Sequence, residues 1–379
     1  MKILIFAGTR PEAIKLAPIV RELIGRPASF QVKLCNTGQH EEMIEQAFKD
    51  FGISPDINLQ VMRPEQTLAK LSARLFDAID NLLEFEKPDW VVLQGDTTTA
   101  MVVSLCAFYR NIKIGHIEAG LRSFNRRAPF PEEINRRVTG ILADLHFAPT
   151  QKAKENLLRE GVHPDTVFVT GNTVIDAFLW TLEQIRRSPL KLPDVVETGL
   201  AKGQKIILIT GHRRENFGIG LENICQSVKT LAGLHPDVLF VYPVHLNPNV
   251  RETVYDRLNA VPGVCLTDPL PYKQFVRLVS ECTLILTDSG GIQEEAPSVG
   301  KPVLVMRDVT ERPEGIEAGT SRLVGNNPEK IVQEVSSLLK NPEAYAAMAA
   351  TQNPFGDGKA SRRIVEIMIS QSSRGSATA

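Results

Sequence analysis

The sequence lacks long apolar segments and has no excess of charge of one sign. The apolar run 3–7 is too short for the core of a signal peptide, and no other stretch nears the roughly 18 residues of a membrane span. Lys and Arg number 43 and Asp and Glu 44, giving a formal net charge of −1. No global basic field therefore favours nucleic acid or an anionic membrane. We expect a cytoplasmic protein that binds neither and holds any anionic ligand with local groups.

Cysteine is also scarce, and its spacing carries no motif. The five cysteines are odd in number, lie far apart and form no C-x-x-C pair. Because free cysteine is among the most buried residue types, we expect reduced, structural thiols. The chain also lacks the G-x-G-x-x-G dinucleotide motif, and its histidines show no metal-ligand spacing. We therefore expect neither a redox cofactor nor a metal.

The composition is that of a folded globular protein, with 379 residues of which 43% are hydrophobic and 23% charged. Short β-branched runs alternate with helix-period segments, which is the pattern of parallel βαβ units. The expected strands are 3–6, 32–35, 90–93, 112–117 and 145–148 in a first series and 205–210, 238–242, 264–267, 284–287 and 303–306 in a second. The sequence thus predicts an α/β protein with two sheets in tandem.

The boundary between the two sheets is marked by a loss of periodicity. Pro and Gly interrupt the pattern over 186–204, and an earlier boundary near Gly171 is also compatible with the sequence. We divide the chain into an N-terminal domain, 1–171, a C-terminal domain, 172–358, and a segment 359–379 whose helix returns to the first domain before a frayed tail. Ligands of parallel sheets sit at the carboxyl ends of the strands, so the loops that follow strands are the candidates.

Two such loops in the first half carry polar motifs. Residues 8–12, Gly-Thr-Arg-Pro-Glu, open a helix, and Arg10 with Lys15 suits a phosphate group, although solvated side chains on a turn are equally compatible. Asp96 follows the strand that ends near residue 93. It is either the N-cap of the next helix or a functional carboxylate, and the first role does not exclude the second.

Further carboxylates follow in the same half. Glu118 ends the next strand, two residues after His116, and a metal pair on that strand face is the alternative reading. Glu132 and Glu133 open a helix, where one of them is expected to complement only the helix dipole. Carboxylates that converge push their pKa values apart, so Asp96, Glu118 and Glu132 could together supply an acid and a base.

The second half supplies groups suited to an anion. His212 lies beside two arginines at a strand end, which favours contact with an anion or a sugar. A strand then runs into Ser289, Gly290 and Gly291 at the start of a helix, where exposed N–H groups and a hydroxyl can receive a diphosphate. Glu295, one turn further on, could accept hydrogen bonds from a ribose. A simple glycine-rich turn is the alternative.

Together these motifs resemble the non-hydrolysing UDP-N-acetylglucosamine 2-epimerases of bacteria, in order and spacing, over roughly residues 1–370. The resemblance implies the GT-B architecture, in which two Rossmann-like domains with parallel sheets face each other across a cleft, as a homodimer. It implies reversible conversion of UDP-GlcNAc to UDP-ManNAc without a cofactor, for cell-surface polysaccharide. The reaction would eliminate UDP to give a 2-acetamidoglucal and then add UDP back.

The resemblance also assigns roles. The acid-base residues would be Asp96, Glu118 and Glu132, with His212 beside them. The substrate contacts would be Arg10, Lys15, Arg213, Phe275, Ser289, Gly290, Gly291 and Glu295, with Phe275 stacked on uracil. A second UDP-GlcNAc activates some members at positions that match Gln39, Glu132, Arg213 and His245 here. Where such relatives carry glutamine and arginine, this chain has Glu42 and Glu65, whose charge would repel a diphosphate.

Three other functions remain open. A hydrolysing 2-epimerase would use the same elimination but release ManNAc and UDP. A GT-B glycosyltransferase would use the same nucleotide site and pass the sugar to an acceptor, without need for several proton-transfer groups. A UDP-sugar sensor would have lost the acid-base residues, all of which are present.

Overall fold

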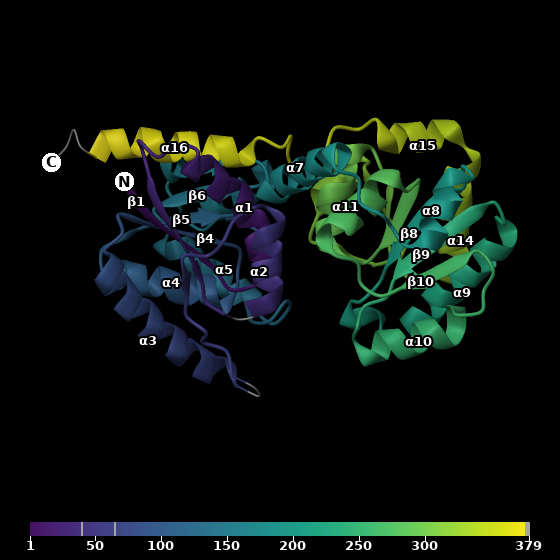
Figure 1. Ribbon diagram of the computed structural model, residues 1–379, viewed down its shortest axis with the longest axis horizontal. Helices are drawn as coiled ribbons and strands as arrows, with labels where there is room; N and C mark the ends of the chain where they lie inside the picture. The colour runs from purple at the N-terminus through teal and green to yellow at the C-terminus, as the bar shows by residue number, and fades with distance from the viewer. Residues whose placement is uncertain (39–40, 64–65, 376–379) are drawn as a thin grey trace. The chain divides into compact units, whose positions relative to one another are not determined.

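The computed structural model of the chain describes residues 1–38, 41–63 and 66–375 (Figure 1). By the contacts between its residues, the chain forms two compact units. The first unit comprises Met1–Ala177 and Phe355–Ala379, and the second comprises Phe178–Pro354.

Each unit contains one parallel sheet. The strands of the first unit are β1 (Lys2–Ala7), β2 (Gln31–Asn36), β3 (Ile57–Asn58), β4 (Trp90–Gln94), β5 (Lys113–Ile117), β6 (Leu145–Ala148) and β7 (Val167–Val169). Their order in the sheet is β3-β2-β1-β4-β5-β6-β7. The strands of the second unit are β8 (Lys205–Thr210), β9 (Val238–Pro243), β10 (Val264–Thr267), β11 (Leu284–Thr287), β12 (Val303–Val305) and β13 (Ser321–Leu323). Their order is β10-β9-β8-β11-β12-β13, and the predicted pair of parallel α/β sheets is thereby confirmed.

Helices connect the strands in both units. Those of the first unit are α1 (Arg10–Ile24), α2 (Glu41–Asp50), α3 (Leu68–Glu86), α4 (Thr98–Tyr109), α5 (Glu132–Leu142), α6 (Gln151–Arg159) and α16 (Ala360–Gly375), while α7 (Thr173–Arg187) runs on into the second. Those of the second unit are α8 (Asp194–Ala201), α9 (Ile219–Leu234), α10 (Pro248–Leu258), α11 (Tyr272–Glu281), α12 (Gly290–Glu295), α13 (Pro313–Ala318), α14 (Pro328–Lys340) and α15 (Pro342–Ala349).

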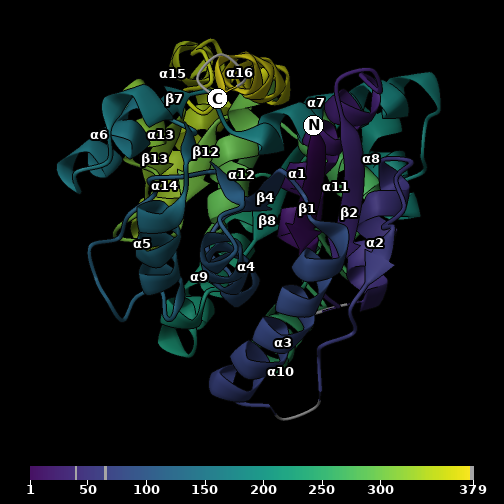
Figure 2. The ribbon, with the colours of Figure 1, turned by 90° about the vertical axis from the view of Figure 1, so that its left-hand side faces the viewer.

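The core of the first unit is formed by apolar side chains that recur at the strand and helix periods. In β1, Leu4 and Phe6 face a cluster formed with α3 and α4, and the alternation of strand side chains turns Ile3 and Ile5 to the other face. All four are buried, as expected for a parallel sheet covered on both sides. Helices α3 and α4 pack side by side (Figure 2), and α1 packs against both α2 and α16. The carboxyl ends of the strands are left for the loops.

The second unit is built in the same way. Apolar residues of β8, β9 and β11 form one cluster with residues of α9, α10 and α14. Tyr242 of β9 is fully buried there, and its hydroxyl donates to the main-chain oxygen of Gly211 at 3.1 Å. A Cβ atom on Gly211 would lie 2.9 Å from that hydroxyl oxygen, so glycine lets the loop after β8 approach the sheet.

The strands that sequence analysis did not predict are β3, β7 and β13. Each has only two or three residues and lies at the end of its sheet. Strands this short carry little period-2 pattern, and each of the three pairs with a single neighbour.

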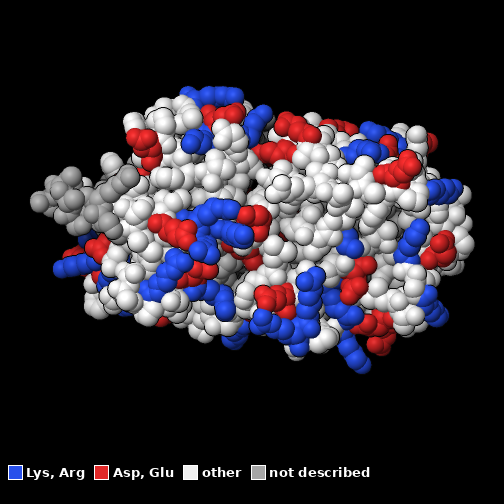
Figure 3. Space-filling view, turned by 90° about the horizontal axis from the view of Figure 1, so that it is seen from above, with Lys and Arg blue, Asp and Glu red and all other residues white. Residues whose placement is uncertain are grey.

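The cysteines, the helix lengths and the surface charges are the features for which the composition gave an expectation. All five cysteines are buried and unpaired, as predicted, and burial raises the pKa of the Cys225 and Cys282 thiols to about 12. Within the described ranges, none of the helices combines the length and the apolar character needed to cross a bilayer. On the face shown in Figure 3, positive and negative side chains are intermixed.

Candidate active site

The loop after β4 lies where the strand order of the first sheet reverses, between β1 and β4, and it meets the end of β5, where the Gly95 N–H donates to the Ile117 oxygen. The turn after β4 begins at Gly95, whose φ of 74° favours glycine. His116 lies on the neighbouring strand, and its Nε2 is 2.8 Å from the Gly95 oxygen. Burial lowers the pKa of His116 to about 3, so the ring is neutral and Nε2 carries the proton that it donates. His116 therefore fixes the turn that presents Asp96.

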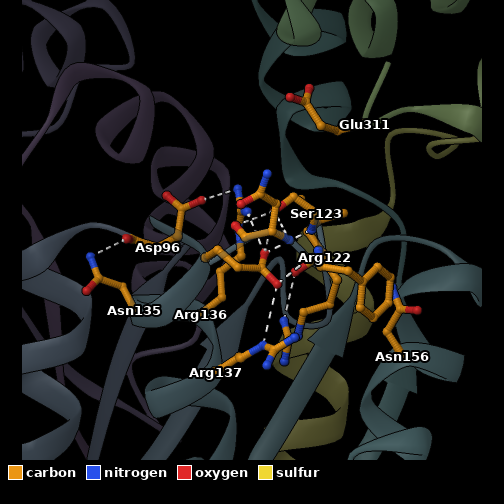
Figure 4. Close-up of polar contacts among 12 residues, drawn as sticks. Asp96, Arg122, Ser123, Asn135, Arg136, Arg137, Asn156 and Glu311 are labelled. Atoms are coloured by element: carbon orange, nitrogen blue, oxygen red, sulfur yellow. Dashed lines mark hydrogen bonds and ion pairs between the residues drawn. The ribbon is translucent and has the colours of Figure 1, made fainter. Parts of the chain in front are cut away.

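Asp96 is not the N-cap of α4. That position is Thr97, whose hydroxyl accepts from the Ala100 N–H at 3.1 Å. The Asp96 carboxylate instead pairs with Arg136 of α5, with 2.5 Å between Nη2 and Oδ2 (Figure 4). Asn135 donates to the Asp96 main-chain oxygen at 2.9 Å. Asp96 is thus oriented by α5 and keeps a partly exposed side chain.

Glu118 stands at the carboxyl end of β5 in a strained backbone conformation. Its φ of 61° is left-handed, which is uncommon for a residue with a side chain. Its Oε2 accepts a hydrogen bond from Gln94 Nε2 at 2.6 Å and pairs with Lys15 Nζ. Lys15, predicted to contact phosphate, therefore contacts a carboxylate, and Gln94 is a partner that sequence analysis missed.

The adjacent acids Glu132 and Glu133 differ completely in their surroundings. Glu133 is fully buried and accepts hydrogen bonds from the Ser123 and Phe124 N–H groups at 2.9 and 3.2 Å. Glu132 is half-buried, and its Oε2, buried itself, has no hydrogen-bond partner among the described residues. Glu133 is therefore the structural acid of the pair, and Glu132 is the one with an unused carboxyl oxygen.

The loop before α5 is held by a chain of charges (Figure 4). Glu133 lies 3.4 Å from both Arg136 and Arg137. Arg122, whose side chain is fully buried, donates to both oxygens of Glu160 at 2.9 and 2.7 Å. A bidentate pair of this kind fixes the orientation of both side chains, so it holds the loop in a defined position.

In the second unit, Asp288 joins the loops after β11 and β8, again where the strand order reverses. It is fully buried and accepts hydrogen bonds from the N–H groups of His212 and Arg213, both at 2.9 Å, and from Asn216 Nδ2 at 3.2 Å. A buried carboxylate with these donors holds the loop in place through hydrogen bonds. This role of Asp288 was not predicted from the sequence.

His212 and its neighbours form the exposed side of this loop. The His212 ring stacks on His245, with 5.4 Å between centroids. Burial lowers the pKa of His212, opposed by the Asp288 carboxylate, while Arg213 and His245 lower it further. The neutral ring is therefore favoured near pH 7, as a hydrogen-bonding group for a ligand.

The glycine-rich turn opens α12. Ser289 is its N-cap residue but makes no capping hydrogen bond through its side chain. A Cβ atom on Gly290 would lie 3.1 Å from Arg312 Cζ, whereas at Gly291 it would meet nothing within 4 Å. A side chain at position 291 would thus meet no neighbour, while Glu295, one turn further on, is buried.

The predicted residues are brought together within each unit. Those of the first unit are Arg10, Lys15, Asp96, Glu118 and Glu132, all on loops or helix starts at the carboxyl edge of its sheet. In the second unit, His212, Arg213, His245 and 289–291 follow β8, β9 and β11. Phe275 is half-buried on α11.

Some candidate residues of a second nucleotide site fall elsewhere. Gln39 and Glu65 lie outside the described residues, and Glu42 falls within α2. The alternative of a metal site at His116 has no support in the part of the chain that the structure describes, where no group of three or more His, Cys, Asp or Glu is arranged around a metal position.

Comparison with known proteins gives full-length matches. A family model described as UDP-N-acetylglucosamine 2-epimerase matches residues 22–369. The UDP-N-acetylglucosamine 2-epimerase of Escherichia coli (strain K12) is 51% identical over 375 residues, covering 97% of this chain and 98% of the relative. That of Yersinia pestis is 49% identical over 370 residues, covering 97% and 98%.

Solved structures agree with these matches. The UDP-GlcNAc 2-epimerase of Neisseria meningitidis, bound to UDP-GlcNAc, has a TM-score of 0.89 and 47% identity, covering 98% of this chain and all of that one. The Methanocaldococcus jannaschii enzyme, in complex with UDP-GlcNAc and UDP, has a TM-score of 0.80 and 35% identity, covering 97% and 99%. Both sheets of this chain are included, which places it in the predicted GT-B-like fold class.

Proposed function

The chain belongs to the UDP-N-acetylglucosamine 2-epimerase family, and from this premise we propose that it interconverts UDP-GlcNAc and UDP-ManNAc without hydrolysis. The observation that carries the proposal is the set of carboxylates at one sheet edge. Asp96 is paired with Arg136, Glu118 with Lys15, and Glu132 has an unused buried oxygen. Three acids in different environments are suited to proton transfer in both directions.

The chemistry explains why several acids are needed. The hydrogen on C2 of the sugar is not acidic, because no carbonyl carbon adjoins C2. We propose that UDP leaves C1 as C2 loses its proton, giving a 2-acetamidoglucal. UDP then returns after a proton has been delivered to the other face of C2. A group must therefore accept a proton on one face and another must donate one on the opposite face.

The second unit is proposed to hold the UDP group. The solved relatives from N. meningitidis and M. jannaschii bind UDP-GlcNAc, and the latter also UDP. Here the Gly290 and Gly291 N–H groups at the start of α12 and the Ser289 hydroxyl would stabilise the diphosphate as its charge develops, and His212 and Arg213 would contact the diphosphate or the sugar. We propose Arg10 as a further diphosphate contact, and that the product serves cell-surface polysaccharide.

Incubation with UDP-GlcNAc in deuterated water tests the proposal. We expect deuterium at C2 of both UDP-ManNAc and recovered UDP-GlcNAc, with no added nicotinamide or metal, because the C2 proton exchanges with solvent in the glycal pathway. Mass spectrometry and NMR of the sugars measure it.

The same experiment separates the alternatives. Free ManNAc and UDP as the main products would indicate the hydrolysing reaction, and sugar transfer with the original C2 hydrogen retained would indicate a transferase. Retention of that hydrogen in an epimerised product would contradict the elimination pathway.

We also propose that the protein is a homodimer. Phe85, Phe108 and Tyr109, at the C-terminal ends of α3 and α4, are 82%, 55% and 69% exposed, and Arg110 ties the two helices together through Asp80. Neighbouring exposed aromatic side chains are typical of association surfaces. Light scattering should give twice the mass of 41.9 kDa, and Phe85→Glu with Tyr109→Glu should shift it to the monomer. A wild-type monomer at micromolar concentration would contradict this.

A further inference from the structure

Glu12 lies at the centre of the first unit's site without a role in the proposed chemistry. It is in the first turn of α1, is 2% exposed, and sits at the point where the strand order reverses between β1 and β4. Acids in the first turn of a helix are common on surfaces, where they complement the dipole. A fully buried one beside a cluster of functional carboxylates needs a different explanation.

The hydrogen bonds of Glu12 connect two loops that are far apart in sequence. Its Oε2 accepts from the Gly8 N–H at 3.0 Å and from the Thr9 hydroxyl at 2.7 Å, both in the turn after β1. Its Oε1 accepts from the Thr97 hydroxyl at 2.7 Å, in the turn after β4. Glu12 therefore links the turn that carries Arg10 to the turn that carries Asp96 through hydrogen bonds.

The donors to Glu12 are all neutral, as are the N–H donors of the buried Asp176, whereas two other acids of this unit are paired with lysines. Glu86 is paired with Lys2 and Lys33, and Glu118 with Lys15. Burial raises the pKa of Glu12 to about 7, the Thr97, Thr9 and Gly8 hydrogen bonds oppose this, and the negative charge of Asp96 adds to it.

The charged groups of the surrounding elements are accounted for by one another. Asp96, on the turn after β4, is paired with Arg136 of α5. Glu118, after β5, is paired with Lys15 of α1 itself. Asp96 is thus the charge that acts on Glu12.

We propose that Glu12 is a positioning residue of the reaction, which holds the turn of Asp96 against the turn of Arg10 most firmly when it is ionised, because a carboxylate accepts hydrogen bonds from all three donors through both of its oxygens. This inference rests on the proposed function, because it assigns a proton-transfer role to Asp96. It adds a buried side chain that does not touch the substrate and that links the two turns in either a protonated or an ionised form.

The test compares the pH dependence of kcat for the wild type and for Glu12→Gln. Wild-type kcat should rise through about pH 7 as Glu12 ionises. The amide keeps the size of the side chain and stays neutral, so the variant should lack this step and lie about tenfold below the wild type at pH 8, with KM unchanged. Below pH 6 the two proteins should be alike.

Three further variants separate positioning from general stability. Thr97→Ala removes both the hydrogen bond to Glu12 and the N-cap of α4, so it should lower kcat and stability together, whereas Thr97→Ser keeps the hydroxyl and should restore both. Glu86→Gln alters an equally buried acid at the other edge of the sheet and should leave the pH profile of kcat as it is.

Urea unfolding tests the ionisation without any substrate. Because the pKa of Glu12 is raised from 4.5 to about 7 in the folded state, its contribution to stability is present below pH 4.5 and is lost as pH rises through 7. Glu12→Gln should remove that part of the pH dependence.

The outcomes distinguish this inference from the function on which it rests. If the wild type introduces deuterium at C2 but Glu12→Gln keeps its kcat and its step near pH 7, the inference is wrong and the proposed function stands. If the wild type does not epimerise UDP-GlcNAc at all, the function fails, and the unfolding curves still report the Glu12 ionisation.

Discussion

Glu118→Gln should lower kcat for epimerisation by roughly 10²-fold or more, which is the usual contribution of a positioned acid or base. The amide has nearly the same shape, and its oxygen can still accept the Gln94 hydrogen bond. It cannot exchange a proton, and it no longer pairs with the charge of Lys15. The left-handed backbone at Glu118 shows that the surrounding structure holds this side chain in place at some cost, as is common at functional sites.

Glu86→Gln is the matched control for this loss. Glu86 is also buried and also receives lysine side chains, those of Lys2 and Lys33, but it lies at the opposite edge of the same sheet. Both variants lose a buried ion pair, so both should be less stable to urea, and only Glu118→Gln should lose kcat. Steady-state kinetics at a temperature where both are folded measures the difference. Equal kcat in Glu118→Gln and the wild type would reduce Glu118 to a structural role.

The fold was predictable from sequence because its central strands are long and apolar. Strands such as β8 and β11 are buried on both faces, and their residues form continuous runs bounded by polar turns. The edge strands β3, β7 and β13 have only two or three residues, and each pairs with a single neighbour. The strands missed from the sequence are thus those that depend on pairing with a neighbouring strand more than on their own residue pattern.

The candidate site was predictable only in part, for a related reason. Acids that follow strands can be read from the sequence, since strand ends converge in a parallel sheet. Their partners cannot, because Arg136 is 40 positions from Asp96 and Lys15 more than 100 from Glu118. Glu12 and Asp288 were given no role from the sequence, because each holds a turn of another loop, which only the fold brings within reach.

The pairing of partners across loops also resolves an ambiguity that local sequence leaves open. Glu132 and Glu133 are adjacent, identical in type and both in the first turn of α5. The helix dipole favours either one equally. Only the burial of Glu133 under the loop of Ser123 and Phe124 separates them.

Glu132→Gln and Glu133→Gln should therefore have opposite effects. Glu132 has a carboxyl oxygen that bonds to none of the described residues, so its amide should leave the urea midpoint unchanged while kcat falls roughly 10²-fold or more. In Glu133→Gln, the loss of charge beside Arg136 and Arg137 and of an acceptor for buried N–H groups should cost about 3 kcal/mol of unfolding free energy, with a smaller loss of kcat.

Urea unfolding and steady-state kinetics on the two variants together decide the assignment. The effects on stability and on kcat should fall on different members of an adjacent pair, so a general disturbance of α5 cannot produce both results. If Glu133→Gln lost kcat at unchanged stability while Glu132→Gln remained active, the acid-base role would belong to Glu133. The buried hydrogen bonds from the Ser123 loop would then orient a catalytic carboxylate, and Glu132 would be the acid that complements the helix dipole.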